Sequence, residues 1–381
     1  MADRRRRSAW GGLLLGLALP AVAEGPPLKL ADRTPHDLSM VVETTLARDL
    51  VTVLEGGTGA PEALRRLRAS PTVGKALEAE KISSGQFFGR LVGTAAGTPD
   101  RVFTPLAAST DSLRTLLDAF DVDGKPAASV LGKRIALLLP PEPARRVRMT
   151  VVPFFGSSAF REIVPFRDVD DLWLFADLAL ALEGGAASTV KRETVLKSLR
   201  GAAAEGWRAL FDAGGRGKGW EEAKNPGFDA LLRQTVLEGP PTLFLVPDDF
   251  FPLDVVLGEP ITRAFDRWNR AVALLADPKR SDLDRAKVLA EGRRGEFWGR
   301  FPAVAGLQIV DALLRLAGRE AFLSALAAGP REVASLYVAT TKKERLPQIG
   351  REARRELEAA RNDRNGQRAK AVTEPGAAGA E

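Results

Sequence analysis

The sequence predicts a mainly α-helical protein with a small central β-sheet, an α+β fold. Over most of the chain, apolar residues recur every three or four positions, which is typical of helices with one buried face. In the middle, three compact apolar runs are separated by Pro, Gly and charged residues, which indicates short strands. Because these runs are continuously apolar, we expect both faces of the sheet to be covered.

The helical spacing begins at Asp37, and Gly56-Gly57 ends the first helix. Shorter helical segments continue to residue 125. The predicted strands lie at 134–139, 147–155 and 171–176. The later helices are predicted at 194–211, 228–246, 255–275, 282–291, 296–316 and 319–326.

These patterns divide the chain into six segments. They are a signal peptide (1–23), an extended lead-in (24–36), an N-terminal helical part (37–125), the sheet with further helices (126–343), a charged surface helix (344–364) and a disordered tail (365–381). The charged helix is predicted to be solvated because its charges alternate in sign.

Residues 1–23 have the three parts of a cleavable secretory signal. Arg4–Arg7 precede a short apolar run, and Ala21-Val22-Ala23 fits the small-x-small cleavage rule. The run is shorter than the ~20 apolar residues that span a bilayer. We therefore expect an exported protein, periplasmic or extracellular, that begins at Glu24 and has no stable membrane span. An uncleaved anchor is the alternative, and Arg6-Arg7 leaves the twin-arginine route open.

The composition excludes several classes of chemistry. The chain has no Cys, so it forms no disulfide and offers no thiolate. Its formal charge of +6 falls to about +3 when the signal, with four Arg and one Asp, is removed. Charges of both signs are mixed along the chain, without a basic stripe interleaved with aromatic residues. We therefore expect no nucleic-acid partner.

His36 is the only histidine. Its Pro-flanked segment favours a loop or a helix start over a lone ligand or base. A Ser-His-Asp triad would have to use it, and the chain has no G-x-S-x-G motif. A zinc-peptidase helix needs two His one turn apart, which a single His does not supply. We therefore expect no zinc site, no cofactor and no catalytic residue of these kinds.

Loop aspartates leave carboxylate chemistry open. Asp121-Val-Asp123-Gly124 begins like a calcium loop but lacks the remaining ligands and the closing Glu, which favours a turn. Acidic clusters lie at Asp168, Asp170 and Asp171, and at Asp248-Asp249. Paired carboxylates support glycoside hydrolysis. A carboxylate-based hydrolase is therefore one alternative function.

The later segments follow a recognisable order. The helix at 194–211 is followed by the run Leu231–Gly239, which ends in the pair Glu238-Gly239, and then by Gly299–Ile309 and Pro330–Tyr337. This order resembles the gluzincin metallopeptidases, above all poorly characterised bacterial families of zinc-dependent peptidases. In those families a helical N-terminal part leads into a small sheet, an H-E-x-x-H helix and a helix whose E-G motif supplies the third zinc ligand. The resemblance covers roughly residues 37–340.

The H-E-x-x-H motif itself is missing. In its place the chain has Lys197-Ser-Leu-Arg-Gly-Ala-Ala-Ala-Glu205-Gly206. The resemblance therefore implies a degenerate member that has lost zinc hydrolysis and kept the E-G motif. Its relic-site candidates are Arg200, Glu205, Glu238 and Gly239. We expect Glu238 to pair with an Arg, Arg200 before Arg233, and residues 201–204 to pack against the helix of Glu238. Alternatively, Arg200 is an exposed residue and Glu238 an ordinary helix-end carboxylate.

Three functions remain open from the sequence. The first is an exported, non-catalytic, gluzincin-like protein, a pseudo-metallopeptidase that binds an unknown protein or peptide. The second is a helical scaffold of the cell envelope without peptidase ancestry. The third is the carboxylate-based hydrolase.

Overall fold

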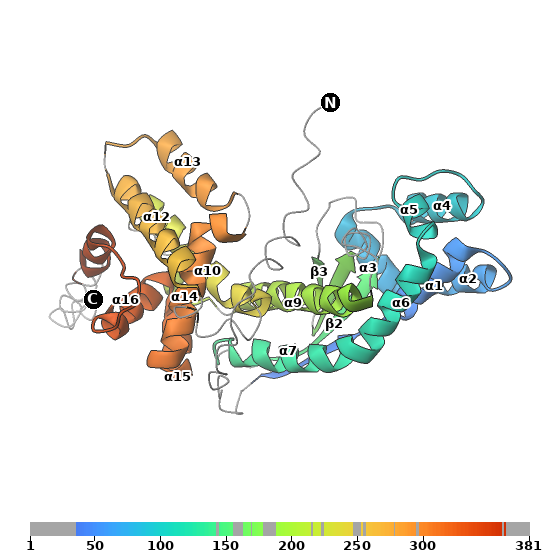
Figure 1. The fold of residues 1–381 in the computed structure, drawn as a ribbon, viewed down its shortest axis with the longest axis horizontal. Coiled ribbons are helices and arrows are strands. Elements are labelled where there is room, and N and C mark those ends of the chain that lie inside the picture. The colour runs from blue at the N-terminus through green and yellow to red at the C-terminus, as the bar shows by residue number, and fades with distance from the viewer. Residues whose placement is uncertain are drawn as a thin grey trace, which may run out of the picture. The chain divides into compact units, whose positions relative to one another are not determined.

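The computed structural model describes residues 36–141, 145–154, 163–168, 170–177, 188–214, 216–221, 225–246, 253, 257–277, 279–294, 297–359 and 362. They form a mainly helical structure with one small sheet, which confirms the predicted fold class (Figure 1). The predicted signal (1–23), nearly all of the lead-in and the predicted tail (365–381) lie outside the described residues.

The chain divides into two compact units. Described residues up to Gly214 form unit 1, and those from Arg216 onward form unit 2. The sequence analysis placed a division at 125/126, ahead of the sheet. The difference arises because β1 (Asp37–Val42) pairs with β2 (Arg146–Phe154), so the N-terminal helices and the sheet share unit 1.

Strand β1 corrects the helix predicted from Asp37. Buried Met40 and Val42 alternate with more exposed neighbours, which is the period of a strand. The spacing of the apolar residues at 38–42 fits the period of a helix as well as that of a strand. The β-branched pair Val41-Val42 favours the strand. The helix begins only at Thr45, after the strand has ended.

Unit 1 contains eight described α-helices. They are α1 (Thr45–Glu55), α2 (Ala60–Ala69), α3 (Pro71–Glu80), α4 (Ser84–Ala95), α5 (Phe103–Ala107), α6 (Thr110–Ala119), α7 (Lys125–Leu137) and α9 (Ser188–Asp212). A π-helical segment, Phe120–Gly124, continues α6 directly into α7, so Asp121 and Asp123 lie within helix and the turn predicted there is wrong.

The sheet has the strand order β1-β2-β4-β3. Its other two strands are β3 (Ile163–Asp168) and β4 (Asp171–Asp177). Strands β1, β2 and β4 are parallel, and β3 pairs antiparallel with the outer side of β4. The runs predicted at 147–155 and 171–176 are therefore strands over nearly their whole length, and β3 is a strand that the sequence analysis did not predict.

Helices lie on both faces of this sheet. On one face, Met40 meets Gly132 of α7, and Met149 and Leu174 meet Gly206 of α9. On the other face, α1 packs on β2 and α3 on β3. Covering both faces explains the continuously apolar runs in the two central strands, β2 and β4.

The strand predicted at 134–139 is wrong. These residues form the last turn of α7 and the three residues after it. Ala128, Leu131 and Ile135 are buried at three- and four-residue spacing, so the apolar run continues a helical face that begins before it. When the run at 134–139 is considered without those earlier residues, it has the same compact apolar pattern as a buried strand.

The pKa of the Asp100 carboxyl lies well below its ordinary value. Arg90 Nε donates to it at 2.8 Å, and the backbone N–H groups of Val102 and Phe103 donate at 2.8 and 2.9 Å. The Arg90 guanidinium, with further help from the backbone donors, lowers the pKa of Asp100 to about 2, against a partial opposing effect of burial.

We expect an NMR titration of Asp100 to give this low pKa, and Arg90→Gln to raise it. Because the folded pKa lies below the ordinary value of 3.8, the carboxylate stabilises the fold above that value. This contribution is lost as the pH falls toward about 2. A pKa that is the same in the wild type and the variant would contradict the role given to Arg90.

The elements described in unit 2 are all helices. Its α-helices are α10 (Pro226–Leu245), α12 (Gly258–Ala276), α13 (Asp282–Gly292), α14 (Phe301–Leu316), α15 (Arg319–Ala328) and α16 (Pro330–Thr341), with 3₁₀ turns at Lys218–Trp220 and Phe297–Gly299. A further helix covers residues 351–359. Within the described parts of the chain, no helix has the length and apolar character needed to cross a membrane.

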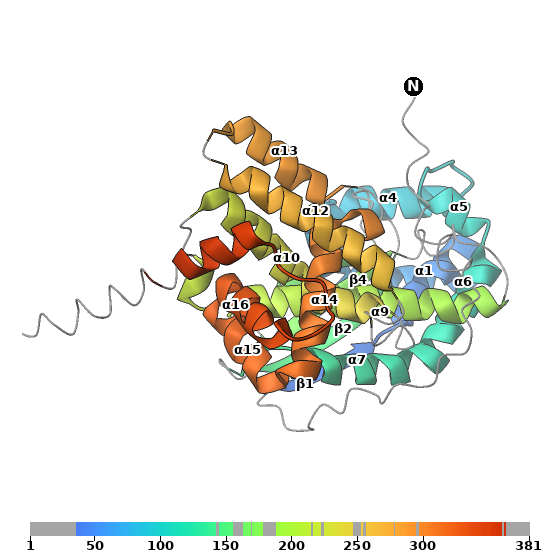
Figure 2. The same cartoon turned by 60° about the vertical axis from the view of Figure 1, so that its left-hand side comes forward.

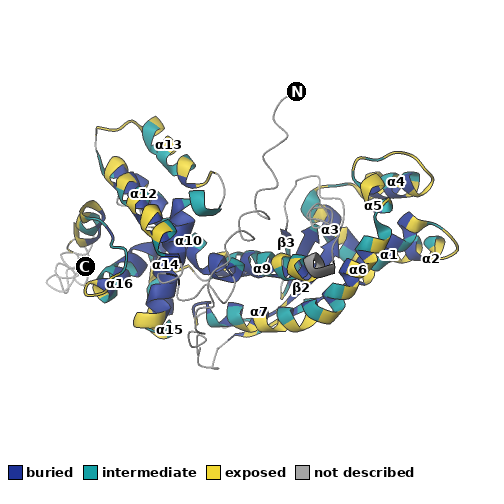
Figure 3. Ribbon diagram, in the orientation of Figure 1, coloured by how far each residue is buried: buried dark blue, intermediate teal, exposed yellow. Residues whose placement is uncertain are grey.

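Helix α14 is the centre of unit 2. It is buried on all sides from Phe301 to Leu314, and α10, α12, α15 and α16 pack on it (Figures 2 and 3). A helix that is apolar all round is expected to be enclosed by other elements. Its N-terminal half carries the small residues Ala303, Ala305 and Gly306, which allow close approach by its neighbours.

The charged helix predicted at 344–364 is shorter and less solvated than expected. The helix covers 351–359, and residues 344–350 are not helical. Ile349, Ala353 and Leu357 are buried at four-residue spacing, so one face of the segment is anchored despite its high charge. The hydroxyl of Tyr337 donates to the Pro347 carbonyl at 2.7 Å and ties the preceding segment to α16.

Candidate functional site

Arg200 and Glu205 of the relic-site candidates lie on α9 in unit 1, and both are half-buried. Glu205 forms an ion pair with Arg208, one turn further along the same helix. Arg200 and Glu205 therefore share a helix, as the sequence analysis assumed, and the carboxylate of Glu205 is engaged locally.

The small residues after Arg200 line a close approach of α9 to the sheet. Ala202, Ala203 and Ala204 are buried. A Cβ on Gly201 would lie 3.5 Å from the Ile163 side chain of β3, and one on Gly206 would lie 3.3 Å from Met149. The small residues thus have a packing partner inside unit 1. Their predicted packing on the helix of Glu238 stays a prediction.

Glu238 and Gly239 lie on α10 in unit 2, where Gly239 forms part of a tight helix crossing. A Cβ on Gly239 would lie 2.7 Å from the Gly306 carbonyl oxygen of α14. A Cβ on Gly306 would lie 2.0 Å from the Thr235 carbonyl oxygen. The backbones of α10 and α14 therefore touch at these two glycines. Glu238 is half-buried. Arg200 and Glu238 belong to different units, so their ion pair stays a prediction.

A buried ion pair anchors the N-terminal end of α10. Arg331 donates to both carboxylate oxygens of Asp229, at 2.7 and 3.0 Å, and the two side chains are 10% and 5% exposed. Asp229 also accepts the backbone N–H of Asn225 at 2.9 Å, while Asn225 caps the helix by accepting the N–H of Phe228. The pair links α10 to α16 and has a structural role.

Several of the other residues singled out from the sequence are engaged in the fold. His36 is buried, and its Nε2 lies 2.7 Å from the Pro140 carbonyl oxygen. Asp121 forms ion pairs with Arg48 and Lys125, and Asp168 with Lys75. Asp248-Asp249 lies outside the described residues. Among the residues that the structure does describe, no three His, Cys, Asp or Glu side chains are grouped as a metal site would need.

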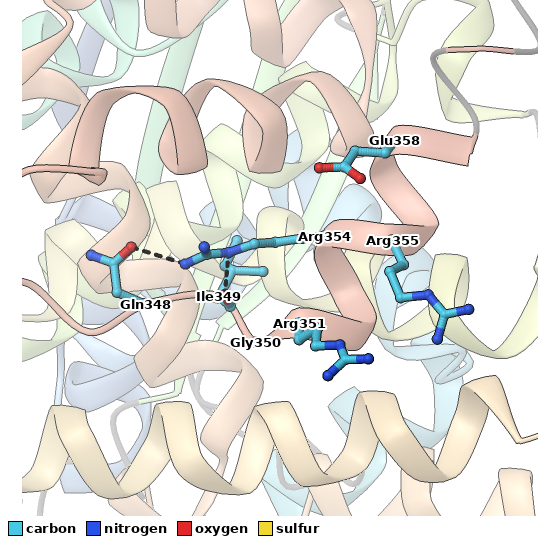
Figure 4. Close-up of a pocket in the computed structure, with 7 residues that line it drawn as sticks. All are labelled: Gln348, Ile349, Gly350, Arg351, Arg354, Arg355 and Glu358. Carbon is cyan, nitrogen blue, oxygen red and sulfur yellow. Dashed lines mark hydrogen bonds between the residues drawn. The ribbon is translucent and has the colours of Figure 1, made fainter.

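Two surface hollows lie within single units. The first, of about 530 Å³, is lined by one continuous stretch of unit 2, residues 348–358, with three arginines (Figure 4). Arg354 is already used there: its Nε donates to the Ile349 carbonyl at 2.8 Å and its guanidinium to Gln348 Oε1 at 3.2 Å. Because the hollow unites no distant parts of the chain, we give it no functional role.

The second hollow, the sheet-face pocket, lies in unit 1 and has a volume of about 360 Å³. Distant segments build it: β2 and β4 form one wall, and the starts of α1 and α3 form the rim. Its lining residues are Glu43, Thr45, Leu46, Ser70, Thr72, Arg148, Thr150, Asp171 and Trp173. It opens on the sheet face opposite to the one that meets α9.

The sequence analysis missed this pocket, except for Asp171 as part of a loop cluster. A signal was present in β2, where polar Arg146, Arg148 and Thr150 alternate with apolar residues before the strand becomes wholly apolar. Such alternation indicates that one face of the sheet is only partly covered at this end.

Comparison of the chain with protein-family models, with curated proteins and with solved structures finds no match.

Proposed function

We propose that this protein is an exported, non-catalytic binding protein built on a gluzincin-like plan. The observation that carries the proposal is the role of residues 201–204. At the place where the resembling families carry zinc-binding imidazoles, this helix supplies small side chains, and Ala202–Ala204 are buried. In this proposal, the positions that carry the zinc ligands in those families are filled here by small residues that pack in the interior.

The E-G motif supports the same interpretation. Gly239 lies in backbone contact with Gly306, so this motif joins two central helices of unit 2 tightly. A gluzincin-like plan that lost its metal would keep such a contact, because it stabilises the fold independently of the zinc. The binding part of the proposal is supported by the sheet-face pocket, whose walls combine charged, hydroxyl and aromatic side chains.

We expect mature protein, purified from the export compartment and beginning at Glu24, to contain far less than one zinc per chain after dialysis. The physical reason is that the chain has one imidazole and no thiolate, whereas catalytic zinc sites take three protein ligands. Elemental analysis with N-terminal sequencing makes the measurement. Peptide hydrolysis should be absent with and without added zinc.

One tightly held zinc per chain would contradict the proposal. The variant His36→Gln serves as the control for such a result, since it removes the only imidazole while leaving the carboxylates in place. Recovery of the chain from the cytosol with Met1 or Ala2 at its start would contradict the export part.

A further inference from the structure

We propose that the sheet-face pocket binds a free α-amino acid as a zwitterion, with its carboxylate held by Arg148, Thr150 and the start of α3 and its ammonium group held by Asp171. The inference names a ligand for the binding role proposed above and rests on that role. The pocket lies on the sheet face opposite to α9, the helix in unit 1 that carries the relic-site candidates Arg200 and Glu205.

The wall of the pocket presents two opposite charges side by side. Arg148 and Asp171 are register partners on the neighbouring strands β2 and β4, and both line the pocket. Within the described residues neither side chain has an ion-pair or hydrogen-bond partner, and they do not pair with each other. Neighbouring, unpaired charges of opposite sign suit a ligand that carries both charges itself.

Thr150 supplies the observation that points to a ligand independently of these charges. The residue is 4% exposed, lines the pocket and sits beside Trp173 in the strand register. Its hydroxyl has no hydrogen-bond partner among the residues that the structure describes. Because Thr150 lines the pocket, a ligand carboxylate bound there would accept a hydrogen bond from this hydroxyl.

The start of α3 adds donors for the same carboxylate. Ser70, at the N-cap, and Thr72, in the first turn, both line the pocket, and the Ser70 side chain does not cap the helix. The first backbone N–H groups of a helix lack intrahelical acceptors and carry partial positive charge. At α1 the first N–H, of Thr45, is bound by Glu43 Oε1 at 2.7 Å. At α3 the first residue, Pro71, has no N–H, so the first backbone donors are those of Thr72 and Val73.

The remaining wall suits the side chain of an amino acid. Trp173 is half-buried, and Lys75 lies 4.8 Å over its ring while it binds Asp168 at 2.7 Å. Lys75 is therefore occupied and lies against the indole, and Leu46 adds an apolar side chain to the lining. The volume of about 360 Å³ is at the low end for ligand pockets, which run from about 300 to 1,000 Å³, so a small ligand fits best.

Calorimetry and thermal unfolding of the full mature chain test the proposal, with each standard L-amino acid as the ligand. We expect at least one amino acid to bind and to raise the melting temperature. Propionate and isobutylamine, which each carry one of the two charges, should bind at least about 10-fold more weakly. Inorganic phosphate should not compete, because it offers nothing to Asp171.

Three variants probe the pocket itself. Arg148→Gln and Asp171→Asn should each weaken binding about 10-fold or more. Thr150→Val should weaken binding while leaving the ligand-free melting temperature equal or higher, because it removes a hydroxyl that has no partner in the described structure. A purely structural Thr150 would not separate binding from stability in this way. Arg146→Gln is the matched control: it lies two residues from Arg148 on the same strand, is exposed and is outside the pocket.

Binding by none of the amino acids would overturn the inference and leave a protein or peptide partner for the proposed function. If phosphate or propionate bound as tightly as the amino acid, the proposal that the pocket recognises both charges of a zwitterion would be wrong. If Arg146→Gln and Arg148→Gln weakened amino-acid binding equally, the placement of the binding site in the sheet-face pocket would be wrong. The zinc measurement is unaffected by any of these outcomes, so failure of this inference and failure of the non-catalytic assignment are distinguishable.

Discussion

Replacing Gly306 by Ala should destabilise unit 2 by about 3 kcal/mol or more, at the upper end of the range for overpacked cores. The added Cβ would lie 2.0 Å from the Thr235 carbonyl oxygen, so the backbones of α10 and α14 must separate. Elsewhere in a helix, the same substitution gains about 0.5–1 kcal/mol from helix propensity. The clash is with backbone on both sides, so it outweighs this gain. Chemical denaturation measures the free energy of unfolding.

Gly258→Ala is the matched control for this substitution. Gly258 begins α12 in the same unit, and an added Cβ would meet no atom within 4 Å. We expect its free energy of unfolding to stay the same or to rise slightly. A Gly306→Ala protein as stable as this control would mean that α10 and α14 do not cross at their glycines.

The second large effect is expected from Asp229→Ala, which should cost about 3–5 kcal/mol because it leaves the buried guanidinium of Arg331 without its carboxylate. The substitution also removes the acceptor of the Asn225 N–H at the start of α10. Adding Arg331→Met to Asp229→Ala should recover part of the loss, since no buried charge then remains. A double-mutant cycle on the free energy of unfolding measures both effects.

The exposed pair of Glu259 and Arg263 on α12 provides the comparison. Their side chains are 80% and 68% exposed, with a separation of 3.6 Å. Glu259→Ala should cost under about 1 kcal/mol. If Asp229→Ala cost no more than this, the Asp229–Arg331 pair would be dispensable for holding α10 to α16.

The elements that the sequence predicts best are those with long periodic patterns. The helices predicted at 228–246, 255–275 and 282–291 appear as α10, α12 and α13 with small changes at their ends, whereas α9 begins earlier than predicted, at Ser188. Short apolar runs were ambiguous, because a run of five or six residues fits one turn of a buried helix as well as a strand. That ambiguity explains both the helix predicted over β1 and the strand predicted over the end of α7.

The pocket could not be predicted from local patterns, because its residues come from segments far apart in the chain. Ser70, Arg148 and Trp173 meet only through the strand order β1-β2-β4 and the placement of α3 on the sheet. The relic-site candidates, in contrast, came from a resemblance in segment order. Sequence placed them correctly on two helices, α9 and α10, but the partner of Glu238 depends on tertiary structure.

The parallel pairing of β1 with β2 has a consequence for how the chain acquires its structure. All of α1 to α7 lies between these two strands, so closing their ladder requires a long loop of chain to be brought together first. Contacts of such large sequence separation form slowly compared with the helices between them. During synthesis, β1 cannot form its ladder until β2 has also been synthesised.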